Sequence, residues 1–276
     1  MNYHFEILPP SPIFRPYIEY YKNVVTDAEG TFKCVPNNSE ELYFNFKKSH
    51  LYSNNHYSLD DPHIYFVGLH QYEQEAYATI DGSISGGFVI VFKPNGIQNL
   101  FRLSNDEIFG YAIEGEYIFR SMSEKLWHEL KEITDIAKKK AKVESFLLRF
   151  VNPDFDPSNF VNHILQLIKQ KRGLLSTGEI SKRFNISLRT LERKFIDGVG
   201  MSPKEYLQIT RLNHALNLLQ GKNGFSLTRM SYLSGYYDQS HFIRDIKKIC
   251  GFPPGTLKKE NQHLEKCDNR NFLKLS

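Results

Sequence analysis

Residues 238–254 read DQSHFIRDIKKICGFPP and predict an amphipathic helix with defined ends. Its apolar side chains recur at the i, i+4, i+7 spacing of one helix face: Phe242, Ile246 and Ile249. Asp238 is suited to cap the first turn, because its carboxylate can accept from backbone amides that lack a partner in the helix. Gly251 favours the left-handed residue that ends a helix, and the two prolines that follow prevent its continuation.

A shorter helix should precede this one. Ser226 can cap it. Its apolar side would be formed by Leu227, Met230 and Leu233. Gly235 then permits a tight turn between the two helices. Two helices joined by a glycine turn, the second with a basic outer face, form a helix-turn-helix, which places its second helix in the major groove of DNA.

The same pattern occurs 51 residues earlier in the chain. Ser176 and Glu179 have the spacing of a capping box, in which each side chain bonds the other residue's backbone amide. Ser187 can cap the helix that follows. Aligning Ser187 with Asp238 pairs Leu191 with Phe242, Arg193 with Arg244, and Phe195 with Ile246. Two helix-turn-helix units therefore form an internal repeat.

A long helix is expected between the two units. Ser202, Pro203 and Glu205 supply an N-cap, a proline at the first helical position and an acid at the third. This helix should run to about Leu219, pack against both units and set the distance between them. Residues 159–171 should form a further helix before the first unit.

Residues 159–258 resemble the double helix-turn-helix domain of AraC/XylS-type bacterial transcription regulators. The resemblance is carried by Ile180-Ser181, Leu191-x-Arg193-x-Phe195, Gly200-Met201-Ser202-Pro203-x-x-Tyr206-Leu207, Arg211-Leu212-x-x-Ala215 and the run 235–254. The chain departs from the family pattern at four packing positions: Ser181 and Ser231, where alanine is preferred, and Ile246 and Leu257, where aromatic residues are usual. The resemblance implies an all-α DNA-binding domain that follows a sensor domain.

Two recognition helices are therefore predicted at about residues 187–197 and 239–250. The side chains expected to contact base edges are Arg189, Glu192, Arg193, Gln239, Ser240, His241 and Arg244. Those expected to contact phosphates are Lys194, Lys247 and Lys248. Arginine can donate two parallel hydrogen bonds to guanine, and an exposed Ile243 could touch a thymine methyl group. The alternative for Arg193 and Arg244 is a surface ion pair, with Glu192 or Asp245.

Charge is divided unevenly along the 276 residues. Residues 159–260 contain 17 Lys and Arg against 7 Asp and Glu, whereas residues 1–158 contain 15 against 22. A basic half beside an acidic half suggests a polyanionic partner for the basic half. Three scattered cysteines fit a reducing compartment without disulfides. The N-terminus shows no secretion signal and no apolar run is long enough to span a membrane, so a cytoplasmic location is expected.

The expected fold class is α+β, with a mainly β, cupin-like domain over residues 1–152 and an all-α domain over residues 159–260. Short runs rich in Val, Ile, Tyr and Phe have strand length and lie at residues 3–8, 14–23, 41–46, 64–69, 76–80 and 87–92. The run FKPNG at residues 92–96 is similar to a stretch in the N-terminal domains of some AraC-type regulators. The N-terminal domain is therefore expected to serve as a sensor or dimerisation module.

After residue 121 the apolar spacing becomes helical, through Met122, Leu126, Leu130 and Ile133 and again through Val143, Phe146, Leu147 and Phe150. The three lysines at 138–140 are expected to form a solvated edge or turn between these helices. Residues 152–157, which include two prolines, should be a linker. Residues 259–276 are polar and are expected to be disordered.

No catalytic or metal centre is predicted. His56, His63 and His70 recur every seven residues, but that step alternates between the faces of a strand, so ordinary loop histidines are favoured over a metal site. The pairs Glu40-Glu41 and Asp60-Asp61 are expected to be solvated. Residues 81–87 lack the lysine of a P-loop and are interpreted as a turn, so no cofactor is implied.

The sequence thus favours a sequence-specific DNA-binding transcription regulator that is not an enzyme. Double-stranded DNA is the expected partner, and the further candidates are a small-molecule effector, a second copy of the chain and RNA polymerase. One alternative is an RNA-binding protein, which would need exposed aromatic side chains for base stacking. The other is an enzyme that its DNA-binding domain targets to DNA, which would need a nucleophile or a set of metal ligands.

Overall fold

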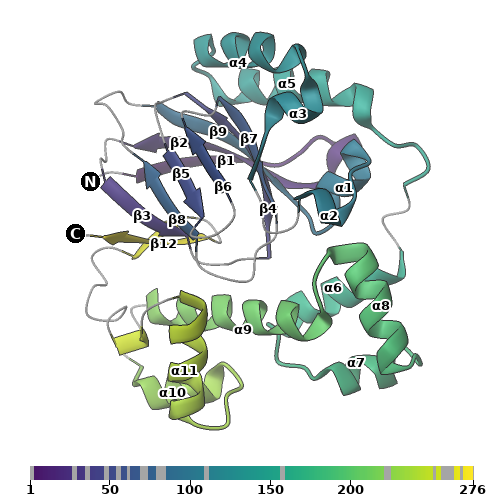
Figure 1. Cartoon of the computed structure of the whole chain (residues 1–276), viewed down its shortest axis with the longest axis vertical. Helices are drawn as coiled ribbons and strands as arrows, with labels where there is room; N and C mark the ends of the chain where they lie inside the picture. Colours follow the sequence, from purple (N-terminus) through teal and green to yellow (C-terminus); the bar gives the residue numbers. More distant parts are fainter. Residues whose placement is uncertain are drawn as a thin grey trace.

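The computed structural model contains two six-stranded antiparallel sheets with helices on one side, and a second group of helices below them (Figure 1). It describes residues 3–26, 30–34, 38–46, 50–53, 57–60, 63–68, 74–78, 85–108, 112–155, 159–220, 225–250, 253–255, 264–267 and 270–275. This arrangement confirms the α+β fold class, with a mainly β domain followed by a helical one.

The strands form two sheets. The first has the order β1 (Tyr3–Leu8), β2 (Ile18–Thr26), β9 (Ser85–Phe92), β4 (Glu40–Asn45), β7 (Ile64–Val67) and β10 (Ala112–Glu114). The second has the order β11 (Leu264–Cys267), β12 (Arg270–Leu275), β3 (Gly30–Cys34), β8 (Gln74–Ala78), β5 (His50–Ser53) and β6 (Tyr57–Asp60). One expected strand begins later than predicted, because Phe14 lies in a 3-10 helix, η1 (Pro12–Phe14), and β2 starts only at Ile18.

Helices cover one face of the first sheet. They are α1 (Gly96–Phe101), α2 (Asn105–Ile108), α3 (Gly115–Phe119), α4 (Met122–Glu132), α5 (Ile136–Leu147) and the 3-10 helix η2 (Leu148–Phe150). Alternate residues of a strand share a face. Leu42 and Phe44 of β4 accordingly pack in one buried cluster with Leu130 of α4 and Val143 of α5. The first sheet therefore lies between the second sheet and the helices (Figure 1).

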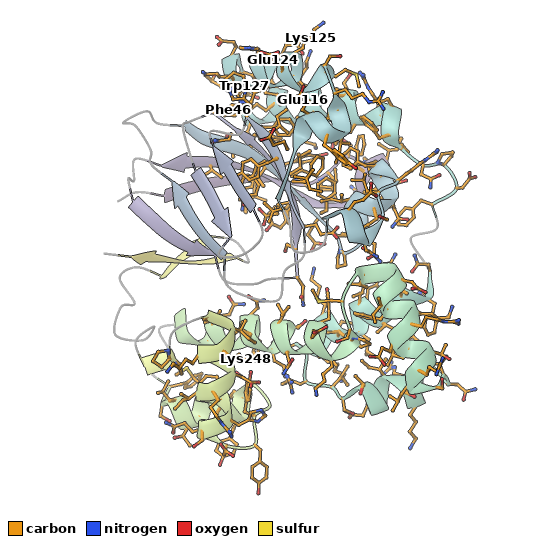
Figure 2. All side chains as sticks on the ribbon, in the orientation of Figure 1. Phe46, Glu116, Glu124, Lys125, Trp127 and Lys248 are labelled. Atoms are coloured by element: carbon orange, nitrogen blue, oxygen red, sulfur yellow. The ribbon has the colours of Figure 1, made fainter. Side chains whose placement is uncertain are left out.

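The lysine run at 138–140 is not a solvated turn, so that prediction is wrong. It lies in the first turns of α5, where the Asp135 carboxylate accepts from the Lys138 amide. Lys139 is only 3% exposed, and its Nζ lies 4.5 Å from the centre of the Phe46 ring. Burial lowers the pKa of the Lys139 ammonium. The start of α5 packs on the first sheet near Phe46 and Trp127, which are labelled in Figure 2.

The Glu40-Glu41 pair is also not solvated. Both residues are on β4, between β9 and β7, and Glu40 is 1% exposed. Glu41 is fully buried, with its Oε2 3.9 Å from Nζ of Lys22. The prediction failed because the two carboxylates begin a central strand, which periodicity over a few residues does not reveal.

Other parts of the chain bear on earlier expectations. Residues 264–267 and 270–275 form the strands β11 and β12, and β12 pairs with β3, so the prediction of disorder is wrong for these residues. His63 stacks on Trp127 with ring centres 4.0 Å apart. The side chains of the other expected loop histidines, as well as Gly251 and residues 81–84 and 156–158, lie outside the described residues.

Two absences hold for the residues that the structure describes. No group of three His, Cys, Asp or Glu side chains among them could hold a metal ion. None of the described helices combines the length and apolar character needed to cross a membrane.

The C-terminal helices form two compact units. They are α6 (Phe160–Gln170), α7 (Thr177–Arg183), α8 (Leu188–Val199), α9 (Pro203–Gln220), α10 (Leu227–Leu233) and α11 (Gln239–Cys250). The first apolar cluster joins α6, α7, α8 and the start of α9 through Ile164, Ile180, Phe195 and Tyr206. The second joins the later part of α9 to α10 and α11 through Leu212, Met230 and Phe242. As predicted, α9 packs against both units.

Candidate nucleic-acid interface

The predicted caps fix where the paired helices begin. Ser176 and Glu179 form the expected capping box at α7, with Glu179 N 3.1 Å from Ser176 Oγ and Ser176 N 2.7 Å from the Glu179 carboxylate. The hydrogen bonds that the Ser176 amide and hydroxyl donate to the Glu179 carboxylate lower the pKa of Glu179. Ser187 and Ser226 cap α8 and α10, and the Asp238 carboxylate accepts from the His241 amide at 2.7 Å at the start of α11.

Both turns between paired helices use the same backbone geometry. Asn185 (φ 51°) and Gly235 (φ 73°) are left-handed. The amide that follows each of them donates back across the helix end, from Ile186 to the Ser181 carbonyl at 3.1 Å and from Tyr236 to the Ser231 carbonyl at 2.9 Å. This is the Schellman pattern of helix termination. Asparagine tolerates the left-handed conformation, which explains why the first turn needs no glycine.

The serines that depart from the family pattern are accommodated by local hydrogen bonds. Ser231 is fully buried, and its hydroxyl donates to the Thr228 carbonyl at 2.7 Å. The Ser181 hydroxyl donates to the Ile186 carbonyl at 2.5 Å. Because buried hydroxyl groups are costly only when they lack a partner, both substitutions leave the turns intact.

The second helix of each unit has one buried and one exposed face. Leu191 and Phe195 of α8 and Phe242 and Ile246 of α11 are buried, as predicted. The exposed side chains include all but one of the predicted site residues: Arg189, Glu192, Arg193, Lys194, Ser240, His241, Arg244, Lys247 and Lys248. Figure 2 shows side chains projecting from both helices, with Lys248 labelled on α11.

The guanidinium groups of Arg193 and Arg244 are available for a partner. Within the part of the chain that the structure describes, neither forms an ion pair, and Asp245 lies instead 3.7 Å from Nε2 of His241. The alternative of a surface ion pair for these two arginines is therefore not what the structure shows.

Two predicted contacts need correction or refinement. Ile243 is half-buried against the second cluster, not exposed as expected, and its contact with a thymine methyl group stays a prediction. Gln239 is half-buried, and its Oε1 accepts from the Thr228 hydroxyl at 2.7 Å. That bond orients the amide and leaves its NH2 group as the donor.

Sequence reasoning missed an exposed aromatic residue beside this face. Tyr237 is 88% exposed and directly precedes the cap Asp238. The signal was present in the alignment of the units, since Asp238 follows Gly235 by three positions whereas Ser187 follows Asn185 by two. Tyr237 is the extra residue.

Two family models match the chain. Residues 180–260 match a model described as a helix-turn-helix domain, and residues 6–114 match one described as Domain of unknown function (DUF6597). The first match spans both units from Ile180 onward, and the second spans the first sheet from β1 to β10.

Among proteins of known sequence, the chain is similar to HTH-type transcriptional activators named RhaS. It is 33% identical over 81 residues to that of Pectobacterium carotovorum subsp. carotovorum (strain PC1), covering 29% of each chain. It is 29% identical over 99 residues to that of Escherichia fergusonii, covering 36% of this chain and 35% of the relative. The chain thus matches about a third of the length of these relatives.

Two solved structures show the same fold over most of the chain. One is an apo ToxT variant from Vibrio cholerae strain SCE256, with a TM-score of 0.50, 15% identity and coverage of 87% of this chain and 97% of that one. The other is ToxT from Vibrio cholerae O395 bound to (E)-4-(8-methylnaphthalen-1-yl)but-3-enoic acid, with a TM-score of 0.50, 14% identity and coverage of 87% and 99%. Together with the two capped units on α9, these matches identify residues 180–260 as a double helix-turn-helix domain of the AraC/XylS type.

Proposed function

We propose that this protein is a sequence-specific DNA-binding transcription regulator whose helices α8 and α11 enter successive major-groove segments. The observation that carries the proposal is the repeated arginine: Arg193 and Arg244 occupy equivalent positions of the two units, and both are exposed and unpaired among the described residues. Two such helices on one face of DNA read sites about 34 Å apart, roughly one helical turn.

Each exposed side chain has a proposed role. Base edges are contacted by Arg189, Glu192, Arg193, Gln239, Ser240, His241 and Arg244, and phosphates by Lys194, Lys247 and Lys248. The bond from Thr228 supports this role for Gln239, because an amide with a fixed NH2 donor can discriminate between bases. The Nζ atom of Lys194 lies 5.6 Å from the ring centre of Phe160 on the neighbouring helix α6. This position to one side of α8 suits a contact with the DNA backbone.

The N-terminal domain, residues 1–152, is proposed to sense an effector or to join two copies of the chain. A ToxT structure of similar fold holds a small carboxylic acid, which supports a small-molecule effector. Dimerisation would raise affinity by linking two DNA-binding domains. A regulator of this kind would work in the cytoplasm, with RNA polymerase as a further partner. Since both domains are proposed to act by binding, no enzymatic activity is proposed.

The test compares duplex DNA with RNA for the whole chain. Random duplex DNA is passed through successive rounds of binding and sequencing, and the enriched duplex then competes with single-stranded and double-stranded RNA of the same sequence. We expect enrichment of a two-part site with parts about ten base pairs apart, and displacement by duplex DNA alone. Preferential displacement by single-stranded RNA would favour the RNA-binding alternative instead.

A further inference from the structure

The C-terminal end of α8 is held by a side chain of the N-terminal domain. The last four carbonyl groups of a helix have no partner within it. At the end of α8, Nδ2 of Asn105 donates to the Asp197 carbonyl at 2.8 Å and to the Ile196 carbonyl at 3.4 Å. Asn105 belongs to α2, which Figure 1 shows directly above this end of α8.

Gly200 makes the contact possible from the other side. It ends α8 with φ of 82°, and its amide donates to the Ile196 carbonyl at 2.8 Å. A Cβ atom at this position would lie 3.1 Å from Cβ of Asn105. Another residue would therefore meet backbone strain, and its Cβ would be in tight contact with Asn105, so glycine favours the close approach of α2 to α8.

The orientation of the Asn105 amide is fixed by a chain of hydrogen bonds. Nε2 of Gln98 donates to Oδ1 of Asn105 at 2.8 Å and to Oε1 of the buried Glu40 at 2.5 Å. The Glu40 oxygen and the Asn105 side-chain carbonyl oxygen that face Gln98 both accept, so the NH2 group of Gln98 points towards them. The NH2 group of Asn105 then points towards α8. Glu40 thus orients Gln98, Gln98 orients Asn105, and Asn105 presents its donor to α8.

A second contact starts two residues before Glu40. Nδ2 of Asn38 donates to the Tyr206 carbonyl at 3.1 Å and to the Thr210 hydroxyl at 2.6 Å, both on α9. The Tyr206 side chain is buried near Glu40, whose negative charge adds to burial in raising the pKa of the Tyr206 hydroxyl. Residues 38–40 therefore connect to α8 through one route and to α9 through another.

Among the residues that the structure describes, these contacts reach α8 and the first turns of α9, where Tyr206 packs in the first cluster. An ion pair between Nζ of Lys169 on α6 and the Glu19 carboxylate, at 2.6 Å, adds a third point at the surface. The second unit is joined to the first through α9, and its recognition helix α11 is positioned from within the unit by Asp238 and Thr228.

We propose that Asn38, Glu40, Gln98 and Asn105 form a clamp through which the N-terminal domain positions α8 and leaves α11 free of this control. The contacts of the clamp do not depend on the proposed DNA-binding function. Only their consequence rests on that function, namely that the N-terminal domain adjusts base preference in one half of the binding site. Asn105 is the positioning residue, because its amide is the group that touches the recognition helix.

The test uses the full chain with Asn105→Ala and Asn105→Asp. Alanine removes the donor, and aspartate places a negative charge against the helix end, where the carbonyl dipoles disfavour it. The matched control is Asn99→Ala, since the Asn99 side chain donates only within the N-terminal domain, to the Asn95 carbonyl at 2.6 Å. The first measurement is hydrogen exchange of the free protein over residues 196–200 and over α11.

Both Asn105 variants should exchange faster at residues 196–200 by about 5–10-fold, as the loss of one net hydrogen bond implies, with aspartate the faster. Exchange in α11 should stay unchanged, and Asn99→Ala should match the unaltered chain. An unchanged end of α8, or an equal rise in α8 and α11, would overturn the clamp whether or not the protein binds DNA.

The second measurement is selection of DNA sites by the same variants. Preference should weaken only at the base pairs that Arg193→Ala also affects, and not at those affected by Arg244→Ala. Equal weakening at both parts of the site, or none at either, would refute control of one half. If the unaltered chain selected no DNA at all, the proposed function would fail, while the exchange result would still decide the clamp.

Discussion

In the first unit α8 ends against the N-terminal domain, whereas in the second unit α11 is positioned by contacts inside the unit. Both units share serine caps on their first helices, the Schellman turn and an exposed arginine at the same position. The second helices each have their own cap, Ser187 and Asp238, and differ in a further contact, which is Asn105 at the end of α8 and Thr228 at the start of α11. The difference teaches that two copies of one DNA-binding motif can have their second helices positioned in different ways, one by another domain and one by its own unit.

The largest expected effect tests whether the two units are separate cores. Ile246 is fully buried in the second cluster, so Ile246→Asp places an unpaired charge there and should destabilise that unit by about 4 kcal/mol or more. Hydrogen exchange should show loss of protection in α10 and α11, while α7 and α8 keep theirs. The control is Leu188→Asp, because Leu188 in the first turn of α8 is 55% exposed and an acid is favourable at that end of a helix. Simultaneous loss in α7 and α8 would mean that the units fold as one.

The next effect concerns the buried carboxyl at the base of the clamp. Burial raises the pKa of Glu40 from 4.5 to about 7, although hydrogen bonds from Gln98 and the Ile97 amide oppose the rise. The folded chain therefore keeps a proton that the unfolded chain releases. The stabilisation from Glu40 is complete below pH 4.5 and is lost as the pH rises through 7. It amounts to about 3 kcal/mol.

Urea unfolding of the unaltered chain and of Glu40→Gln across pH 4 to 8 measures this effect. The difference in unfolding free energy between the two proteins should change with pH in the direction given, since glutamine does not titrate. A difference that stayed constant across this range would show that folding leaves the pKa of Glu40 unchanged and that its environment is more polar than the structure indicates.

The smallest expected effects separate phosphate contacts from base contacts on α11. Lys247→Ala or Lys248→Ala should weaken binding to all duplexes alike and lower the salt slope by about one unit. The control is Lys125→Ala on α4, at the far end of the molecule from α11 (Figure 2), which should leave the slope unchanged. A sequence-dependent loss in the α11 variants would reassign these lysines to base reading.

Local features of the helical domain could be predicted from the sequence because caps, apolar spacing and turn residues act within a few positions. Ser187, Asp238 and Gly235 are examples in which the residue type alone determines the backbone role. The clamp could not be predicted, because Asn105 and Asp197 are 92 residues apart and no periodic pattern of the sequence links the two residues.

Burial of charged residues was the main error in the N-terminal domain. Glu40 and Lys139 each occur in a polar run that suggests solvent exposure, yet both are buried because their elements pack on neighbours distant in the sequence. The position of a strand within a sheet and the face of a helix that meets it depend on the tertiary arrangement. For this reason the predicted strands were more accurate than the predicted exposure of their side chains.

The most direct test of the account is site selection with Arg193→Ala and Arg244→Ala, each at two salt concentrations. Each variant should lose about 1–3 kcal/mol of binding free energy and relax preference at a few base pairs only. The two affected patches should lie about ten base pairs apart, one for each recognition helix. If both variants kept the full base preference and only weakened binding uniformly, α8 and α11 would not be sequence readers and the account would be contradicted.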